Sequence, residues 1–262
     1  MGSKRSSLHS VRVAGASDNG RLLPAVQLTG KCDRFVLRNG VELPCLGFGT
    51  YMIPNTEEGE RAVRDAVSLG FRHIDTAAQY GNEDMVGRAV RDSGVPRSEF
   101  FITSKLKNAE QGYGSALRAF EKTCEDLGTD YLDLYLIHWP KVGGKEDAWE
   151  SQISDTWRAF EELYQAGRIR AIGVSNFLVH HMETLLEHAS VVPFVNQIEL
   201  NPTYQQREIV SWCERHGVQL EAWAPLGRGR MFTNEDVCAM AKRLGKDVGQ
   251  ICVRWALQKG FV

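Results

Sequence analysis

The sequence predicts an α/β fold, a (β/α)8 TIM barrel with an N-terminal β-hairpin cap. Seven short apolar segments alternate with amphipathic helical patterns, which is typical of a parallel sheet with crossover helices. One strand and one helix together take about 30 residues, a repeat that suits a closed barrel. The length of 262 residues also fits a barrel built as one domain.

The predicted elements begin with a hairpin. In FVLRNGVELP, residues 35–44, two apolar runs are joined by Asn39-Gly40, the strongest short signal for a hairpin. The strand candidates that follow are Cys45–Tyr51, His73–Ala77, Phe100–Leu106, Tyr131–Trp139, Ile169–Phe177, Phe194–Leu200 and Gln219–Ala224. Helical patterns cover residues 57–70, 82–94, 112–128, 153–167, 207–217 and 251–260. Several of them end at a glycine, as helices with left-handed C-terminal caps do: Gly70, Gly128, Gly167 and Gly217.

The two ends of the sequence depart from this pattern. Residues 1–31 are rich in Ser, Gly, Arg and Lys and lack periodicity, so we expect a flexible extension before a barrel domain at residues 32–262. MGSKRS matches the myristoylation pattern at Gly2, and Lys4 and Arg5 would add attraction to a membrane. A chance match, an added start and an organelle presequence are the alternatives. Phe261-Val262 have the character of an eighth strand that is only begun.

Composition excludes several classes of function. A net charge of −2 argues against nucleic acid as the main partner. The six cysteines are scattered and form no C-x-x-C, so we expect a reduced, cytoplasmic chain without a bound metal. No apolar run is long enough to span a membrane.

Polar or aromatic residues recur toward the carboxyl ends of successive strand candidates. In a barrel these ends converge on the face where ligands bind, so we expect one shared site there. Asp75 needs a cationic partner, because an unpaired buried carboxylate costs several kcal/mol. Each residue also has an ordinary interpretation, such as a solvated lysine or a packed core histidine. The residues are Asp75, Lys105, His138, Ser175, Asn176, Gln197 and Trp223, with Tyr80 on the loop after Asp75.

Two glycine-rich runs differ in what they predict. GFGTY at Gly47–Tyr51 lacks the third glycine of a dinucleotide fingerprint and is not a Rossmann site. LGRGR at Leu226–Arg230 follows a strand, so its backbone amides would be able to approach a pyrophosphate, with Arg228 or Arg230 adding charge. The pair His180-His181 has no third ligand in view, and we interpret it as surface.

Six motifs together resemble the aldo-keto reductase family. They are GFRHIDTAAQYGNE, FITSKL, LDLYLIHWP, AIGVSNF, VNQIELNP and AWAPLGRG, within a match from about Phe35 to Val262. The branch that looks most similar contains prostaglandin F synthase and 2,5-diketogluconate reductase. The resemblance implies a monomeric oxidoreductase that reduces aldehydes and ketones with NADPH. The family continues with an eighth β/α unit that grips the 2′-phosphate, so we expect a barrel lacking most of that unit.

The resemblance also assigns roles to individual residues. Asp75, Tyr80, Lys105 and His138 match the catalytic tetrad. Tyr51 and Trp139 lie beside strand ends, so we expect them to join Tyr80 and His138 as aromatic walls of the substrate pocket. Ser175, Asn176 and Gln197 would hold the nicotinamide carboxamide, and Trp223 would stack on its ring. The full set of cofactor-binding residues implied is Gly49, Thr50, Asp75, Ser175, Asn176, Gln197, Trp223, Ala224, Pro225, Leu226, Gly227 and Arg228.

Elementary chemistry agrees with the four catalytic roles. Carbonyl reduction needs a hydride donor and a proton donor, and a free tyrosine is a poor acid at neutral pH. A Lys105 ammonium would lower the pKa of Tyr80, Asp75 would fix that lysine, and His138 would orient the substrate oxygen. Rim packing is the alternative for Tyr51 and Trp139. The alternative for the whole chain is a catalytically weak or inactive barrel fragment that binds cofactor or a protein partner.

Overall fold

A curled parallel sheet forms the centre of the structure. The computed structural model describes residues 28, 30–141 and 149–262. Within them, seven strands follow the order β3-β4-β5-β6-β7-β8-β9, so each strand pairs with the next one along the chain. Every strand lies inside its predicted segment, which confirms the α/β barrel architecture. The strands are β3 (Gly47–Gly49), β4 (His73–Asp75), β5 (Phe101–Leu106), β6 (Leu132–Ile137), β7 (Ile169–Ser175), β8 (Val195–Glu199) and β9 (Gln219–Trp223).

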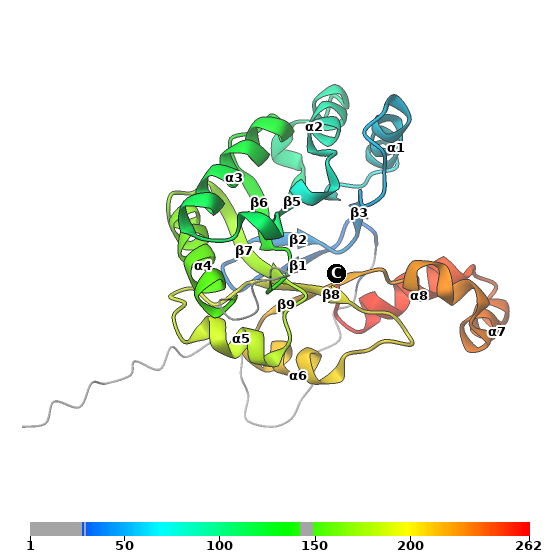
Figure 1. Cartoon of the computed structure of the whole chain (residues 1–262). Coiled ribbons are helices and arrows are strands. Elements are labelled where there is room, and N and C mark those ends of the chain that lie inside the picture. The colour runs from blue at the N-terminus through cyan, green and yellow to red at the C-terminus, as the bar shows by residue number, and fades with distance from the viewer. Residues whose placement is uncertain (1–27, 29, 142–148) are drawn as a thin grey trace, which may run out of the picture.

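Helices surround this sheet (Figure 1). The six predicted helical patterns are confirmed, and α5 and α7 are added to them. The four predicted terminal glycines all have a left-handed backbone, with φ between 64° and 92°. The helices are α1 (Glu57–Ser68), α2 (Glu83–Asp92), α3 (Tyr113–Leu127), α4 (Trp149–Gln165), α5 (Val179–Leu186), α6 (Arg207–His216), α7 (Glu235–Leu244) and α8 (Val248–Gln258). Short 3-10 turns include η1 (Ala78–Tyr80) and η5 (Gly227–Thr233).

The predicted hairpin closes one end of the barrel. Strands β1 (Arg34–Val36) and β2 (Glu42–Pro44) pair antiparallel. From the turn between them, the Arg38 guanidinium donates to the carbonyls of Val192 and Pro193 at 3.0 and 2.9 Å. These carbonyls lie just before β8 begins, so the hairpin covers the amino-terminal ends of the strands. The carboxyl ends, where the polar residues were predicted, are at the opposite face.

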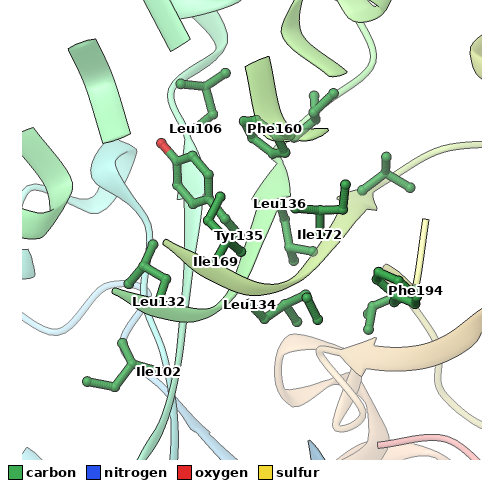
Figure 2. Packing of buried hydrophobic residues seen from close by; sticks show 14 of the residues in the cluster. Ile102, Leu106, Leu132, Leu134, Tyr135, Leu136, Phe160, Ile169, Ile172 and Phe194 are labelled. Carbon is green, nitrogen blue, oxygen red and sulfur yellow. The ribbon is translucent and has the colours of Figure 1, made fainter. Parts of the chain in front are cut away.

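Alternation along the strands decides which side chains enter the barrel. Every residue of β6 is buried, as expected for a parallel strand covered on both faces. The Tyr135 ring stacks on Phe160 of α4, with ring centroids 4.7 Å apart, so Tyr135 faces the helices (Figure 2). Leu132, Leu134 and Leu136 therefore point into the barrel. His138 continues that inward series just beyond the strand end.

The last residues continue the sheet beyond β9. The Val262 amide donates to the Leu220 carbonyl at 3.0 Å, and the Ala222 amide donates to the Val262 carbonyl at 2.8 Å. This is the position predicted for the start of an eighth strand. Among the described residues, no helix combines the length and hydropathy needed to cross a membrane. The expectations for Gly2, Lys4 and Arg5 lie outside the described residues.

Candidate active site

The buried Lys105 contacts two of the other predicted catalytic residues, Asp75 and Tyr80. The Lys105 side chain points inward from β5 and is 1% exposed. Its Nζ donates to Asp75 Oδ1 at 2.6 Å, to the Thr76 carbonyl at 2.9 Å and to the Tyr80 hydroxyl at 3.4 Å. The aspartate at the end of β4 thus has the cation that the sequence required. Turn η1 directly after β4 brings Tyr80 back over the lysine.

His138 completes the group at the end of β6. Its ring meets the Tyr80 ring edge-on, with centroids 5.6 Å apart. Burial, followed by the positive charge of Lys105, lowers the pKa of His138 to about 4. Its buried Nδ1 has no hydrogen-bond partner among the described residues. His138 is therefore a neutral imidazole at neutral pH, able to donate one hydrogen bond to a ligand.

The Lys105 charge lowers the pKa of Tyr80, as predicted, but burial has the larger and opposite effect. The pKa of Tyr80 is therefore raised overall, because the nearby charge offsets burial only in part. For Lys105 the balance is the reverse: burial disfavours the ammonium, but the charges of Asp75 and Tyr80 outweigh it and raise the pKa. The site therefore holds an intact phenol beside a permanent cation.

The Asp75 carboxylate can be tested by an isosteric change. For the carbonyl reduction that the resemblance implies, Asp75→Asn should lower kcat/KM roughly tenfold, because Lys105 keeps its charge but loses its counter-ion. Loss of that anion also disfavours the ammonium, so the alkaline limb of the pH profile should move to lower pH. Steady-state rates between pH 6 and 10 measure both effects. A loss as large as that of a variant without the lysine would contradict this assignment.

Three of the predicted cofactor residues hold one another at neighbouring strand ends. Asn176 Nδ2 donates to the His138 carbonyl at 2.9 Å and to Ser175 Oγ at 3.1 Å. Trp223 Nε1 donates to Asn176 Oδ1 at 3.0 Å. Asn176 has φ of 63°, a left-handed conformation that is costly for a residue other than glycine and is common at binding sites. These contacts join the ends of β6, β7 and β9.

Gln197 lies between two carboxyl groups. Its Nε2 donates to Asp75 Oδ2 at 2.8 Å and to Glu221 Oε1 at 2.9 Å. Neither contact was predicted, although Gln197 itself was. Gln197 connects β8 to the ion pair across the barrel interior. Among the described residues, no group donates to its Oε1.

The loop after β9 has an irregular backbone. Ala224 and Arg228 have φ of 48° and 53°, and Gly227 and Gly229 also have positive φ. The Arg228 guanidinium lies over the Trp223 ring at 5.3 Å. Arg230 forms a salt bridge with Glu199 at 2.8 Å, so the charge of Arg230 is partly neutralised. Pro225 and Leu226 are half-buried beside these residues.

On the other side of Asp75, β3 supplies the remaining predicted residues. Gly49 pairs with Asp75 in register, and the Thr50 backbone amide and hydroxyl both donate to the Asp75 carbonyl, at 2.9 and 3.1 Å. The Tyr51 ring lies 5.1 Å from the Tyr80 ring. Tyr51 and Trp139 are 60% and 44% exposed, so two aromatic surfaces flank the site.

Sequence reasoning missed the buried residue Glu221. It lies on β9 two residues before Trp223, so both point to the same side of the strand. The two-residue spacing between Glu221 and Trp223 is the signal that could have identified Glu221 as part of the site.

The interpretation of His180-His181 as surface is half wrong. His180 is exposed, but His181 is 6% exposed, packs against Trp149 with ring centroids 5.1 Å apart, and accepts from the Leu178 amide at 3.1 Å.

Comparisons with known proteins agree on one family. A family model described as "Aldo/keto reductase family" matches residues 45–262. Glyoxal reductase of Bacillus subtilis is 50% identical over 230 residues, which cover 88% of this chain and 80% of that protein. The 9,11-endoperoxide prostaglandin H2 reductase of Trypanosoma cruzi is 44% identical, with 86% and 78% covered. A Gox0644 mutant crystallised with NADPH superimposes with a TM-score of 0.80 at 40% identity, covering 87% of this chain and 80% of that one.

Proposed function

The chain belongs to the aldo/keto reductase family, whose cofactor is NADPH, and from that premise we propose that it reduces aldehydes and ketones to alcohols with Tyr80 as the proton donor. One observation carries the proposal. A buried Lys105, ion-paired to Asp75 at 2.6 Å, lies 3.4 Å from the Tyr80 hydroxyl. A lysine is almost never fully buried unless it is paired, and here the buried, paired ammonium also faces a phenol.

The residues at the strand ends fit the nicotinamide half of the cofactor. The Gln197 amide nitrogen is held by two carboxyl groups, so Oε1 is the atom left to accept from the carboxamide. Ser175 and Asn176 lie beside it, and the partly exposed Trp223 ring is available for stacking. Gly49, Thr50 and the 224–228 loop would complete the contacts. When bound, the cofactor supplies the hydride.

The remaining chemistry belongs to the side chains of this protein. A carbonyl oxygen placed between Tyr80 and His138 would accept hydrogen bonds from the phenol and from the neutral imidazole. As that oxygen becomes an alkoxide, the Tyr80 proton passes to it. The Lys105 ammonium stabilises the phenolate that remains, and Asp75 keeps the ammonium in place. His138 stabilises the developing charge without itself being ionised.

Small aldehydes, including dicarbonyls, are the substrates that we infer. The relative from Bacillus subtilis is named for glyoxal, and the two exposed aromatic surfaces, Tyr51 and Trp139, suit an apolar or planar carbonyl compound. A prostaglandin F synthase-like activity is the second substrate class. The relative from Trypanosoma cruzi is named for reduction of a prostaglandin endoperoxide.

Turnover with generic aldehydes tests the proposal. We expect the absorbance of NADPH to fall when glyoxal or nitrobenzaldehyde is added, at a rate proportional to the enzyme concentration. The alternative is a barrel that binds cofactor or a protein partner without turnover. That alternative predicts binding of NADPH but no aldehyde-dependent consumption at any enzyme concentration.

Three further properties belong to the proposal. We infer that the enzyme acts as a monomer, since every residue assigned above comes from one chain, and that it works in the cytoplasm, since its six cysteines are scattered without a C-x-x-C. Lipidation of Gly2 would add a membrane-associated fraction, and the intact mass of the protein from its native cell tests this. An unmodified N-terminus would remove the lipid anchor from the proposal and leave the chemistry as stated.

A further inference from the structure

We propose that Glu221 is a positioning residue of the cofactor site, which fixes the Gln197 amide and makes the relative affinity for NADP+ and NADPH depend on pH. The inference rests on the proposed function in one respect, that Gln197 receives the nicotinamide carboxamide. It adds a buried carboxyl group that touches neither substrate nor cofactor. Its action passes through Gln197 and through its own charge.

The geometry of the Gln197 amide is the first observation. A primary amide nitrogen has two hydrogens, and Gln197 Nε2 has two carboxyl oxygens as acceptors, Asp75 Oδ2 at 2.8 Å and Glu221 Oε1 at 2.9 Å. Both hydrogens are therefore used, and the amide cannot rotate without losing a bond. Gln197 and Glu221 are also direct partners in the β8–β9 register. These contacts leave Gln197 Oε1 as the free acceptor.

The burial of Glu221 is the second observation. Glu221 is 6% exposed, and its Oε2 is buried without a partner in the described part of the chain. A carboxylate in that position has lost its hydration without replacement, which favours the protonated acid. Burial, followed by the negative charge of Asp75, raises the pKa of Glu221 to about 8. Glu221 is therefore mostly a neutral acid at pH 7.

The polar and titratable groups that face Glu221 come from three strands. His73 on β4 lies with Nε2 3.8 Å from Glu221 Oε1, and burial lowers the pKa of His73 to about 4, so it is neutral. Asp75 on β4 and Lys105 on β5 form an ion pair, and Gln197 on β8 is uncharged. With Glu221 protonated, this interior group is electrically balanced. Ionisation of Glu221 leaves it with one net negative charge.

That negative charge distinguishes the two forms of the cofactor. The nicotinamide ring is positive in NADP+ and neutral in NADPH, and the carboxamide on that ring is what Gln197 would hold. An ionised Glu221 therefore favours NADP+, and by linkage bound NADP+ favours ionisation of Glu221. The ratio of the Kd for NADPH to the Kd for NADP+ should rise as pH increases through about 8.

The experiment is a pair of fluorescence titrations, with NADP+ and with NADPH, at intervals from pH 6 to pH 9.5. The 2′-phosphate titrates equally in both cofactors, so its effect cancels in the ratio. For the wild-type chain we expect the ratio to rise roughly three- to tenfold, the range given by a change of half a unit to one unit in pKa. In Glu221→Gln, which keeps an oxygen acceptor but cannot ionise, the ratio should be flat and both affinities at pH 6 near wild type.

Two more variants separate positioning from a general effect on the fold. Glu221→Leu removes the acceptor, so both affinities should fall about tenfold at pH 6, while Glu221→Gln retains them. Glu83→Gln is the matched control. Glu83 is also a buried carboxyl, with its pKa raised by burial to about 7. It lies on the helix side of β5, however, where it accepts a hydrogen bond from the Ser104 hydroxyl at 2.5 Å. Glu83→Gln should keep the wild-type rise in the ratio.

Several outcomes would overturn the inference. A flat ratio in the wild-type chain, or an unchanged rise in Glu221→Gln, would show that Glu221 does not discriminate the two cofactors. If Glu221→Leu does not fold, Glu221→Gln still decides the question. Failure of the wild-type chain to bind either dinucleotide would overturn the proposed function, and this inference with it. Binding without turnover would overturn only the catalytic part.

Discussion

Replacement of Tyr80 by phenylalanine should reduce carbonyl reduction by ~10² or more, with NADPH binding retained. The change removes one oxygen and keeps the ring, so the contact with Tyr51 at 5.1 Å between ring centroids is preserved. The loss should appear in kcat and in kcat/KM together, because the proton is transferred only in the transition state. Steady-state rates with an aldehyde, and a separate titration with NADPH, measure the two properties.

The Tyr80→Phe variant also has an internal control. Removal of a partly buried hydroxyl that contacts Lys105 at 3.4 Å should leave the thermal midpoint within a few degrees of wild type. A near-normal rate in a folded variant that binds NADPH would sink the assignment of Tyr80 as the acid. A folded variant that no longer binds NADPH would show that Tyr80 belongs to the cofactor site instead.

Replacement of Lys105 by methionine should abolish most activity, with an effect at least as large as that of Tyr80→Phe. Methionine fills a similar volume but removes the cation, so nothing stabilises the phenolate that forms when Tyr80 gives up its proton. The burial that already raises the pKa of Tyr80 would then act without opposition. Asp75 would remain buried without its cation, which also lowers stability.

The pH profile separates the chemical and structural consequences of Lys105→Met. A thermal melt measures the loss of stability, and rates between pH 6 and 10 on the folded fraction measure the chemistry. Restoring a cation with Lys105→Arg should recover only part of the activity, because a guanidinium does not fit the compact contacts of Nζ. A wild-type rate and pH profile in Lys105→Met would contradict the role of the ion pair.

Much of this site could be predicted because it follows from local rules. Apolar runs of the right length predicted the seven strands, and Asn39-Gly40 predicted the hairpin that closes the amino-terminal end of the barrel. Residues at the carboxyl ends of parallel strands must converge, so Asp75, Lys105 and His138 were expected to meet. The need for a cation beside Asp75 followed from the cost of an unpaired buried carboxylate, and the resemblance identified Lys105 as that cation.

Other features depend on closure of the barrel and could not be read from one strand. The bond from Gln197 to Asp75 crosses between β8 and β4, and neither strand alone indicates it. The direction of the pKa shift of Tyr80 depends on how much water the packing excludes, because the effect of burial outweighs the charge of Lys105. His181 is buried because α5 turns it toward Trp149, a contact between distant segments.

Transfer of deuterium from the cofactor tests the central claim most directly. The chain would be incubated with NADPH deuterated at the transferred C4 position and with an aldehyde, and the alcohol product analysed by mass spectrometry. We predict one deuterium on the former carbonyl carbon for each NADPH oxidised, and almost no alcohol from Tyr80→Phe in the same time. Alcohol without deuterium, or no aldehyde-dependent oxidation of NADPH by a folded chain that binds it, would contradict the claim that Asp75, Tyr80, Lys105 and His138 form a carbonyl-reducing site.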